Sequence, residues 1–138
     1  MIQLIDTVVS LITVAMEAGG EPHKGKVAVA YVVTVNRPKS GASITDVIFK
    51  PQQFSCWDTN SPTRMNIDKT PESIFAECLS VVLAAMHGLE PDPTNGAVFY
   101  LNKATVMAQA GKLPDWWFID GDASSEMTIG KHSFRRHK

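Results

Sequence analysis

Residues 4–22, LIDTVVSLITVAMEAGGEP, decide the fold, because they combine a helical apolar pattern with an abrupt stop. Apolar side chains recur at helical spacing at Ile5, Val8, Val9, Ile12 and Met16. This spacing predicts a helix with one buried stripe, and the pair Gly19-Gly20 predicts its end. Glu17 then lies in the last turn, about 100° around the axis from Met16. At this border of the buried face we expect a cleft residue.

Further along the chain, local signals predict more helix and little strand. The valines of residues 26–37 (KVAVAYVVTVNR) favour a strand, but the length of the run, its alanines and the nearby Pro22 favour a buried helix. The other expected elements are helices at 43–49, 70–88 and 103–110, a long loop at 51–69, extended segments at 97–101 and 127–134, and a late loop with Trp116-Trp117. The sequence therefore predicts one mainly helical α+β domain over residues 1–138.

Composition limits the classes of function. The chain is 44% hydrophobic and 20% charged, as in ordinary globular proteins, and its net charge of −1 gives no general attraction to nucleic acid or an anionic membrane. The N-terminal stretch lacks a basic segment and is interrupted by Asp6, so we interpret it as a folded helix rather than an export signal. We expect synthesis in a cytoplasm. The basic end of the chain, 131–138, is a solvated tail or a site of attraction to an anionic surface.

Cysteine and histidine give no metal signature. Cys56 and Cys78 are far apart in sequence, so they form one disulfide or stay as two buried thiols, and the sequence leaves both open. Residues 120–124 (DGDAS) partly match a calcium loop but lack its terminal glutamate. The four histidines have no zinc-type spacing: His23, His87, His132 and His137. We expect no metal and no cofactor.

Two carboxylates, Glu17 and Glu21, flank the glycine pair where the first helix ends. Cleavage of a glycosidic bond needs a carboxyl group that stays protonated near neutral pH, and partial burial raises a carboxyl pKa. A glutamate at the end of a helix is, however, more often simply solvated than catalytic. Aromatic and amide side chains in loops and at a strand end either bind sugar rings or pack in the core; they are Gln53, Phe54, Trp57, Tyr100, Asn102, Trp116 and Trp117.

Six short motifs follow one another along the chain. They are EAGGEP at 17–22, GKVAVA at 25–30, Asn36-Arg37, QFS at 53–55 with Trp57, Gly96-Ala97 before Phe99-Tyr100, and GKHSF at 130–134. In this order, from about residue 14 to residue 134, the chain resembles the SleB/CwlJ type of cell-wall hydrolase. That family is known from spore cortex-lytic enzymes and from phage lysis proteins.

The resemblance implies a lysozyme-like fold and lytic transglycosylase activity on peptidoglycan glycan strands. Glu17 matches the family's catalytic acid, which would protonate the oxygen between N-acetylmuramic acid and N-acetylglucosamine. As a carboxylate it would then take the proton of the muramic 6-hydroxyl, giving a 1,6-anhydro product. The residues expected to bind substrate or to support the site are Glu21, Gln53, Phe54, Trp57, Tyr100 and His132.

The sequence leaves alternatives open both for the biological setting and for the reaction. The family's spore enzymes often carry an export signal and a wall-binding module, and we find neither, so we expect a phage endolysin that reaches the wall after release. A virion-associated lysin is the second choice. The alternatives for the reaction are a hydrolytic muramidase with water activated by Glu21, a metal-dependent amidase or peptidase, and a wall-binding protein without activity. We expect a monomer.

Overall fold

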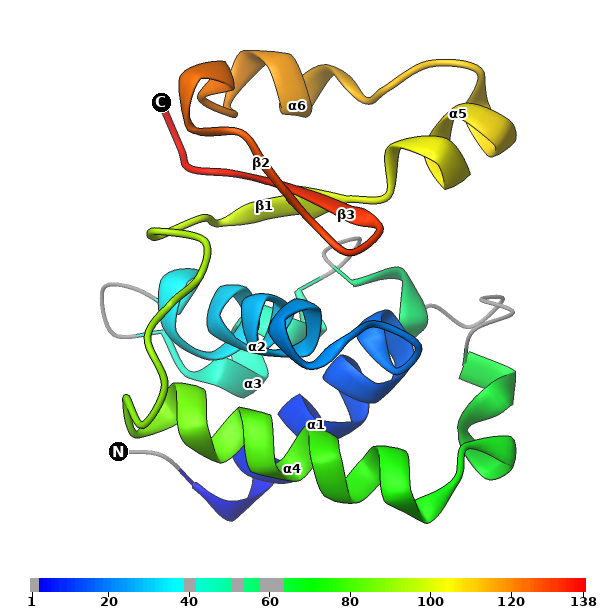
Figure 1. Cartoon of the computed structure of the whole chain (residues 1–138), viewed down its shortest axis with the longest axis vertical. Helices are drawn as coiled ribbons and strands as arrows, with labels where there is room; N and C mark the ends of the chain where they lie inside the picture. Colours follow the sequence, from blue (N-terminus) through cyan, green and yellow to red (C-terminus); the bar gives the residue numbers. More distant parts are fainter. Residues whose placement is uncertain (1–2, 39–41, 51–53, 58–63) are drawn as a thin grey trace.

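The computed structural model describes residues 3–38, 42–50, 54–57 and 64–138 and arranges them in two layers (Figure 1). The lower layer holds α1 (Leu4–Ala18), α2 (His23–Tyr31), the π-helical η1 (Val32–Asn36), α3 (Ile44–Phe49), the 3₁₀ segments η2 (Ser55–Trp57) and η3 (Arg64–Lys69), and α4 (Glu72–Met86). The upper layer holds β1 (Phe99–Leu101), α5 (Lys103–Ala110), α6 (Asp115–Ile119), the 3₁₀ turn η4 (Ala123–Ser125), β2 (Met127–Ile129) and β3 (His132–Arg135). The predicted mainly helical fold with a small β component is confirmed.

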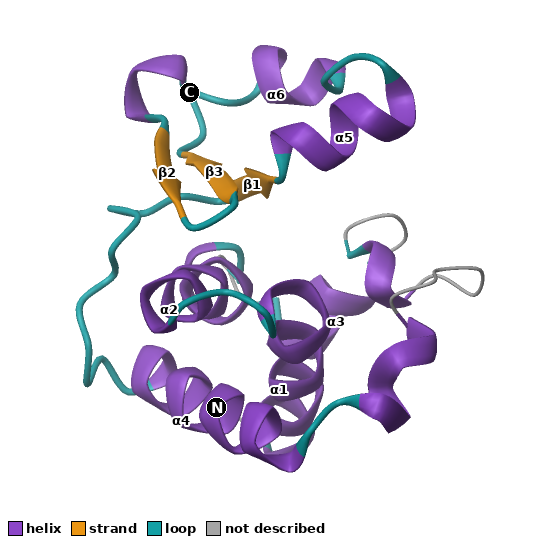
Figure 2. Cartoon of the chain, turned by 45° about the vertical axis from the view of Figure 1, so that its right-hand side comes forward, coloured by secondary structure: helices purple, strands orange, loops and turns teal. Residues whose placement is uncertain are grey.

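Helix α2 lies between the sheet above it and the helices α1 and α4 below it, and it packs against both helices (Figure 2). Every residue from Gly25 to Tyr31 is buried, and η1 continues the helix with three more buried valine and threonine side chains. A helix that is buried on all sides needs no polar face, which explains why the run looked partly like a strand. The predicted helix at 26–37 is therefore confirmed, with a π-helical last turn.

The upper layer is built on a three-stranded antiparallel sheet in the order β1-β3-β2. Phe99 pairs with Arg135 across β1 and β3, and Ile129 pairs with His132 across β2 and β3. A two-residue turn at Gly130-Lys131 joins β2 to β3, and Gly130 has φ of 61°. Tight hairpin turns of this kind require positive φ, which glycine adopts without a steric cost. The predicted extended segments are confirmed.

Asn36 and Arg37, at the end of the π-helical turn, fasten the upper layer to the lower one. The Asn36 amide donates to Asp92 Oδ2 and to the carbonyl of Ala97, both at 2.9 Å. The Nε of Arg37 donates to the carbonyl of Val98 at 2.7 Å. These bonds hold the segment that leads into β1 against the end of η1, so they fix the start of the sheet on the helical layer.

Two predictions about local structure were wrong. The expected late loop at Trp116-Trp117 is helix α6, and Trp117 is fully buried under the guanidinium of Arg135, 4.5 Å above its ring. A helix of five residues has too few turns to show a periodic pattern. The helix expected at 70–88 is α4, which begins at Glu72 with Pro71, and not Thr70, as its N-cap. At the basic end of the chain, β3 is buried, whereas Lys131 and residues 136–138 are exposed.

Cys56 and Cys78 are both fully buried thiols, which decides between the two states that the sequence left open. Burial raises the pKa of the Cys78 thiol to about 11. In the part of the chain that the structure describes, no helix is both long enough and apolar enough to cross a membrane.

Candidate active site

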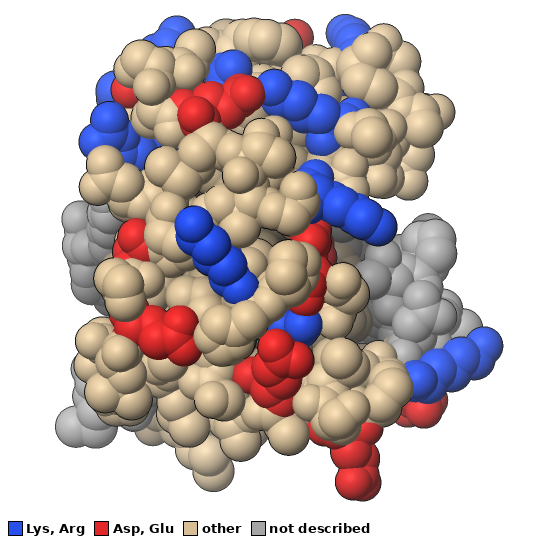
Figure 3. All heavy atoms as spheres, viewed as in Figure 1, with Lys and Arg blue, Asp and Glu red and all other residues tan. Residues whose placement is uncertain are grey.

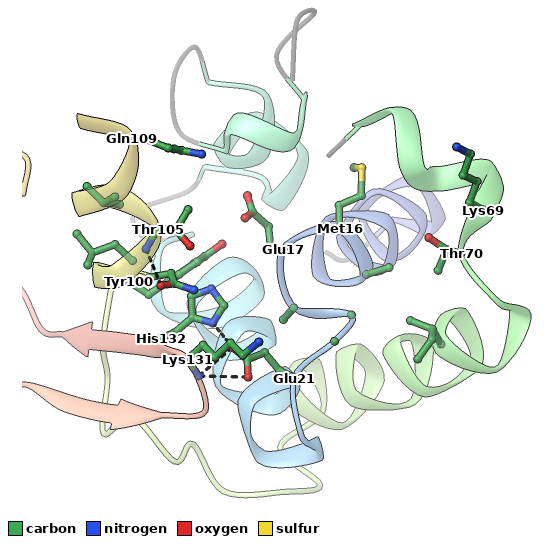
Figure 4. A pocket seen from close by; sticks show the side chains of 18 of the residues that line it. Met16, Glu17, Glu21, Lys69, Thr70, Tyr100, Thr105, Gln109, Lys131 and His132 are labelled. Atoms are coloured by element: carbon green, nitrogen blue, oxygen red, sulfur yellow. Dashed lines mark hydrogen bonds and ion pairs between the residues drawn. The ribbon is translucent and has the colours of Figure 1, made fainter. Parts of the chain in front are cut away.

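A groove of about 980 Å³ lies between the two layers (Figure 4). One wall comes from the end of α1 and the start of α4, and the other comes from β1, α5, α6 and the turn between β2 and β3. Its lining side chains with polar groups are Glu17, Glu21, Arg37, Lys69, Thr70, Tyr100, Asn102, Thr105, Gln109, Trp116, Lys131 and His132. This volume lies at the upper end of the range for small-molecule sites, so the groove can hold more than one small ring.

Glu17 lies in the last turn of α1, half-buried, and its carboxylate points into the groove (Figure 4). The helix ends one residue later, at Ala18, because Gly19-Gly20 follows. The carboxylate therefore stands at the edge of the helical layer and faces Tyr100 of β1 across the groove. This is the border position that the helical pattern predicted.

The phenol of Tyr100 lies next to Glu17 and stays protonated. Burial raises its pKa well above the ordinary value, the charge of Glu17 adds to this effect, and Arg37 opposes it. The hydroxyl is buried, and among the described residues none forms a hydrogen bond with it. Tyr100 thus offers an O–H donor to a group that enters the groove beside Glu17.

Arg37 also lines the groove. Its guanidinium stacks on the Phe54 ring with 4.8 Å between the guanidinium carbon and the ring centroid. Burial lowers its pKa, and the charges of Tyr100 and Glu17 oppose that shift, so the three groups interact electrostatically. Arginine keeps its charge under such conditions, and it therefore supplies a fixed positive charge near the carboxylate.

Glu21 is part of the framework of the groove and joins its two walls. Its carboxylate accepts the backbone N–H of Lys131 at 3.0 Å and 3.2 Å, and Nδ1 of His132 lies 2.8 Å from Oε1. A Cβ at Gly130 would overlap Oε2 of Glu21. The buried ammonium of Lys26 donates to the backbone carbonyl of Glu21. The turn after α1 is therefore fixed to the β2–β3 turn.

His132 gives the fold a dependence on pH. Burial lowers the pKa of its imidazole below the ordinary value of 6.5, although the charge and the hydrogen bond of Glu21 oppose the shift. The unfolded chain then binds the proton more tightly than the folded chain, so this contribution to stability is complete above about pH 6.5 and is lost as the pH falls below it. We expect the unfolding free energy, measured with urea between about pH 5 and 8, to fall on the acid side.

The variant His132→Asn tests this origin, because an amide nitrogen replaces Nδ1 and does not titrate. We expect the stability of this variant to change less below pH 6.5. His87→Asn, at an exposed position after α4, is the control and should keep the wild-type pH profile. An unchanged profile in His132→Asn would assign the effect to another group.

The sequence-based candidates separate into two groups in the structure. Glu17, Glu21, Tyr100 and His132 come together in the groove. Phe54 and Trp57 do not line it: Phe54 is buried under Arg37, and Trp57 donates from Nε1 to Thr13 Oγ1 at 2.8 Å and packs on Phe49. Both support the core below the site. Gln53 lies outside the described residues.

Sequence reasoning missed most of the wall formed by α5 and α6. Thr105 and Gln109 line the groove, but neither belongs to a motif that the sequence singled out as a site. Trp116, which the sequence offered as a sugar-binding or core residue, lines the groove as well. Thr105 and Gln109 are four residues apart, so the sequence could have placed them on one face of the helix expected at 103–110. No group of three or more His, Cys, Asp or Glu side chains within the described ranges is placed to hold a metal ion.

The fold is lysozyme-like, with an acidic residue in the groove between a helical layer and a small antiparallel sheet. The chain belongs to the cell wall hydrolase family, whose model matches residues 20–135. This confirms the resemblance that the ordered motifs indicated.

Two solved structures and a curated relative are similar to this chain. The catalytic domain of the germination-specific lytic transglycosylase SleB from Bacillus anthracis has a TM-score of 0.69 and 29% identity, covering 97% of this chain and 96% of that one. The catalytic domain of the Bacillus cereus SleB protein has a TM-score of 0.70 and 29% identity, covering 99% and 93%. A spore cortex-lytic enzyme of Halalkalibacterium halodurans is 35% identical over 91 residues, 64% of this chain. The match spans 24% of that relative's length.

Proposed function

We propose that this chain is a lytic transglycosylase that cleaves peptidoglycan glycan strands between N-acetylmuramic acid and N-acetylglucosamine. Membership of the cell wall hydrolase family and the similarity to SleB catalytic domains support the substrate and the reaction class. The groove supports it as well, because it is large enough for several sugar rings and carries a half-buried carboxylate in its wall.

In the proposed mechanism Glu17 acts first as acid and then as base. Its protonated carboxyl group gives a proton to the glycosidic oxygen while the bond from that oxygen to muramic C1 breaks. The resulting carboxylate takes the proton of the muramic C6 hydroxyl, whose oxygen bonds to C1. The products are a 1,6-anhydro-muramic end and a new N-acetylglucosamine end, and Glu17 is again protonated. Water takes no part in the reaction.

The bonding of Glu21 is the observation that carries this proposal. A glycosidase that uses water or a covalent intermediate employs a second carboxylate at a defined distance. Of the described residues that line the groove, Glu17 and Glu21 are the two with carboxylates, and both oxygens of Glu21 lie within bonding distance of groups in the β2–β3 turn. This bonding leaves Glu21 poorly suited to activate water, and it favours a reaction in which the substrate supplies the nucleophile.

Tyr100 and Arg37 assist Glu17 in this proposal. The protonated phenol of Tyr100 can donate to the Glu17 carboxylate after proton transfer or to an oxygen of the bound sugar. The positive charge of Arg37 stabilises the carboxylate that forms in the first step. His132 holds Glu21 and forms part of the groove wall.

The products distinguish the proposed reaction from its alternatives. We expect mass spectrometry of digested sacculi to show muropeptides with anhydro-muramic ends, 18 mass units lighter than the hydrolytic products, about one water. Reducing ends without anhydro sugar would instead indicate a hydrolytic muramidase. Released stem peptides, lost with a chelator and restored by zinc, would indicate a metal-dependent amidase or peptidase.

We further propose that the chain acts in host lysis as a phage endolysin, made in the host cytoplasm and acting on the wall after release. The support for this setting is the motif resemblance, which extends to phage lysis proteins. Production of the chain in a bacterial host tests it, with and without a co-produced holin. Lysis that requires both the holin and Glu17 supports the proposal, and holin-independent lysis contradicts it.

A further inference from the structure

Helix α5 forms a wall of the groove although it has no buried residue. The side chain of Asn102 caps its N-terminus by accepting the N–H of Thr105 at 3.1 Å. The ammonium of Lys103 binds Glu126 at 2.7 Å, and Glu126 also binds Arg135 of β3 at 2.8 Å. These contacts attach the helix to the sheet, so its groove-facing side is presented in a fixed position.

The side of α5 that faces the groove has a neutral, hydrogen-bonding character. Asn102, Thr105, Val106 and Gln109 line the groove at helical spacing, and Figure 4 shows Thr105 and Gln109 pointing into it from α5. Amides and hydroxyls both donate and accept hydrogen bonds, which matches the hydroxyl and acetamido groups of amino sugars.

Trp116 of α6 adds an aromatic surface to the same wall. It is 39% exposed, whereas Trp117 is fully buried. Phe99 supports its ring with 5.6 Å between centroids, and Trp117 meets it edge-on at 6.0 Å. A partly exposed indole held in one orientation suits the apolar face of a pyranose ring, because it loses little conformational entropy on binding.

We propose that Trp116, Thr105 and Gln109 form a subsite for one N-acetylhexosamine ring of the glycan strand, an inference that rests on the proposed function. The sugar ring stacks on Trp116, and Thr105 and Gln109 bind its polar groups. A stem peptide fits this part of the wall poorly, because its carboxylates need cations and the lysine that lines this wall, Lys131, comes from the β2–β3 turn and not from α5 or α6. The lining residues of α5 and α6 carry no charge, and over the face shown in Figure 3 the Lys and Arg side chains of the upper layer stand among Asp and Glu.

Tryptophan fluorescence tests the subsite without turnover. The chain has three tryptophans; Trp57 and Trp117 pack inside, so Trp116 is the indole that a bound sugar would shield. The probe is the tetramer of N-acetylglucosamine, titrated into the Glu17→Gln protein. We expect a saturable blue shift of the emission, which is absent when Trp116→Phe is added. No shift, or a shift that persists with Trp116→Phe, would overturn the subsite.

Steady-state kinetics with solubilised glycan strands test the subsite independently of fluorescence. We expect Trp116→Ala to raise KM by about 10-fold or more and to change kcat by less than about 3-fold, because a remote ring contact contributes mainly to binding. Gln109→Ala should raise KM less. The control is Phe118→Ala, also an exposed aromatic of α6 (53%) but outside the groove lining, and it should leave KM unchanged.

The two proposals fail in different ways. Wild-type protein that releases no glycan fragments contradicts the proposed function, whatever the fluorescence shows. Wild-type protein that is active, with an unchanged KM in Trp116→Ala, contradicts the subsite and leaves the function standing. Circular dichroism of each variant checks that a change in KM does not come from unfolding. Because Trp116 and Gln109 are both exposed, we expect the spectra of the variants to match the wild type.

Discussion

Glu17→Gln should lower the rate of peptidoglycan solubilisation by a factor on the order of 10²–10⁴, the usual contribution of a positioned general acid. Glutamine keeps the size and the hydrogen-bonding outline of the side chain but has no proton to give to the glycosidic oxygen. The loss should appear in kcat, because the same carboxyl group serves both proton transfers. Since Glu17 is half-buried at a helix end, the variant should remain folded.

The measurement compares release of soluble muropeptides by the variant and by a matched control. Glu72→Gln is that control, because it removes an exposed carboxylate from the first turn of α4, outside the groove lining. We expect it to keep full activity. If Glu17→Gln retained more than about a tenth of the rate, a factor far below that expected of a general acid, another group would have to donate the proton. In that case Glu21→Gln would be the next variant to test.

Several helix boundaries in this chain were predictable because they depend on neighbouring residues. The Gly19-Gly20 pair ends α1, Ser43 caps α3 by accepting the N–H of Asp46, and Gly111 ends α5 with φ of 73°. Each of these signals acts within a few residues, through backbone entropy, a capping bond or a left-handed conformation. The same local logic placed Glu17 at the edge of the helical layer.

The rest of the site depends on contacts between distant residues, and local signals do not report these. Glu21 and Lys131 are 110 residues apart in the sequence, and the carboxylate of Glu21 accepts the N–H of Lys131. Because of this bond, Glu21 is part of the framework and is not a solvated residue at a helix end. The aromatic residues show the same limit. Whether a tryptophan faces solvent depends on packing, and the adjacent Trp116 and Trp117 have opposite environments, which composition could not show. Family resemblance supplied the proposed role of Glu17, which spacing alone left open.

Gly130→Ala should be the most damaging small substitution in the β2–β3 turn. Two costs add together at this position. The first is the left-handed backbone, with φ of 61°, which costs a residue with a Cβ about 1–2 kcal/mol. The second is the overlap of the new Cβ with the Glu21 carboxylate, whose Cδ would lie 2.9 Å away. The carboxylate would have to move and give up its bonds to Lys131 and His132.

Gly88 separates the two costs, because it has nearly the same φ, 65°, and no atom within 4 Å of an added Cβ. We expect Gly88→Ala to lower the unfolding free energy by about 1 kcal/mol and Gly130→Ala by about 3–5 kcal/mol, the usual range for breaking a buried polar pair. Urea unfolding measures both. Equal losses would mean that the carboxylate moves aside without cost.

The background Glu21→Ala then identifies the partner of the clash. With the carboxylate removed, Gly130→Ala should cost about as much as Gly88→Ala, so the two substitutions at positions 21 and 130 should be coupled by about 2–4 kcal/mol. If Gly130→Ala costs the same with and without Glu21, the strain lies in the turn itself. A coupled result has a consequence for the groove. Lys131 and His132, which follow Gly130, line the groove. Glycine is required at position 130 because the Glu21 carboxylate occupies the space that a side chain would fill.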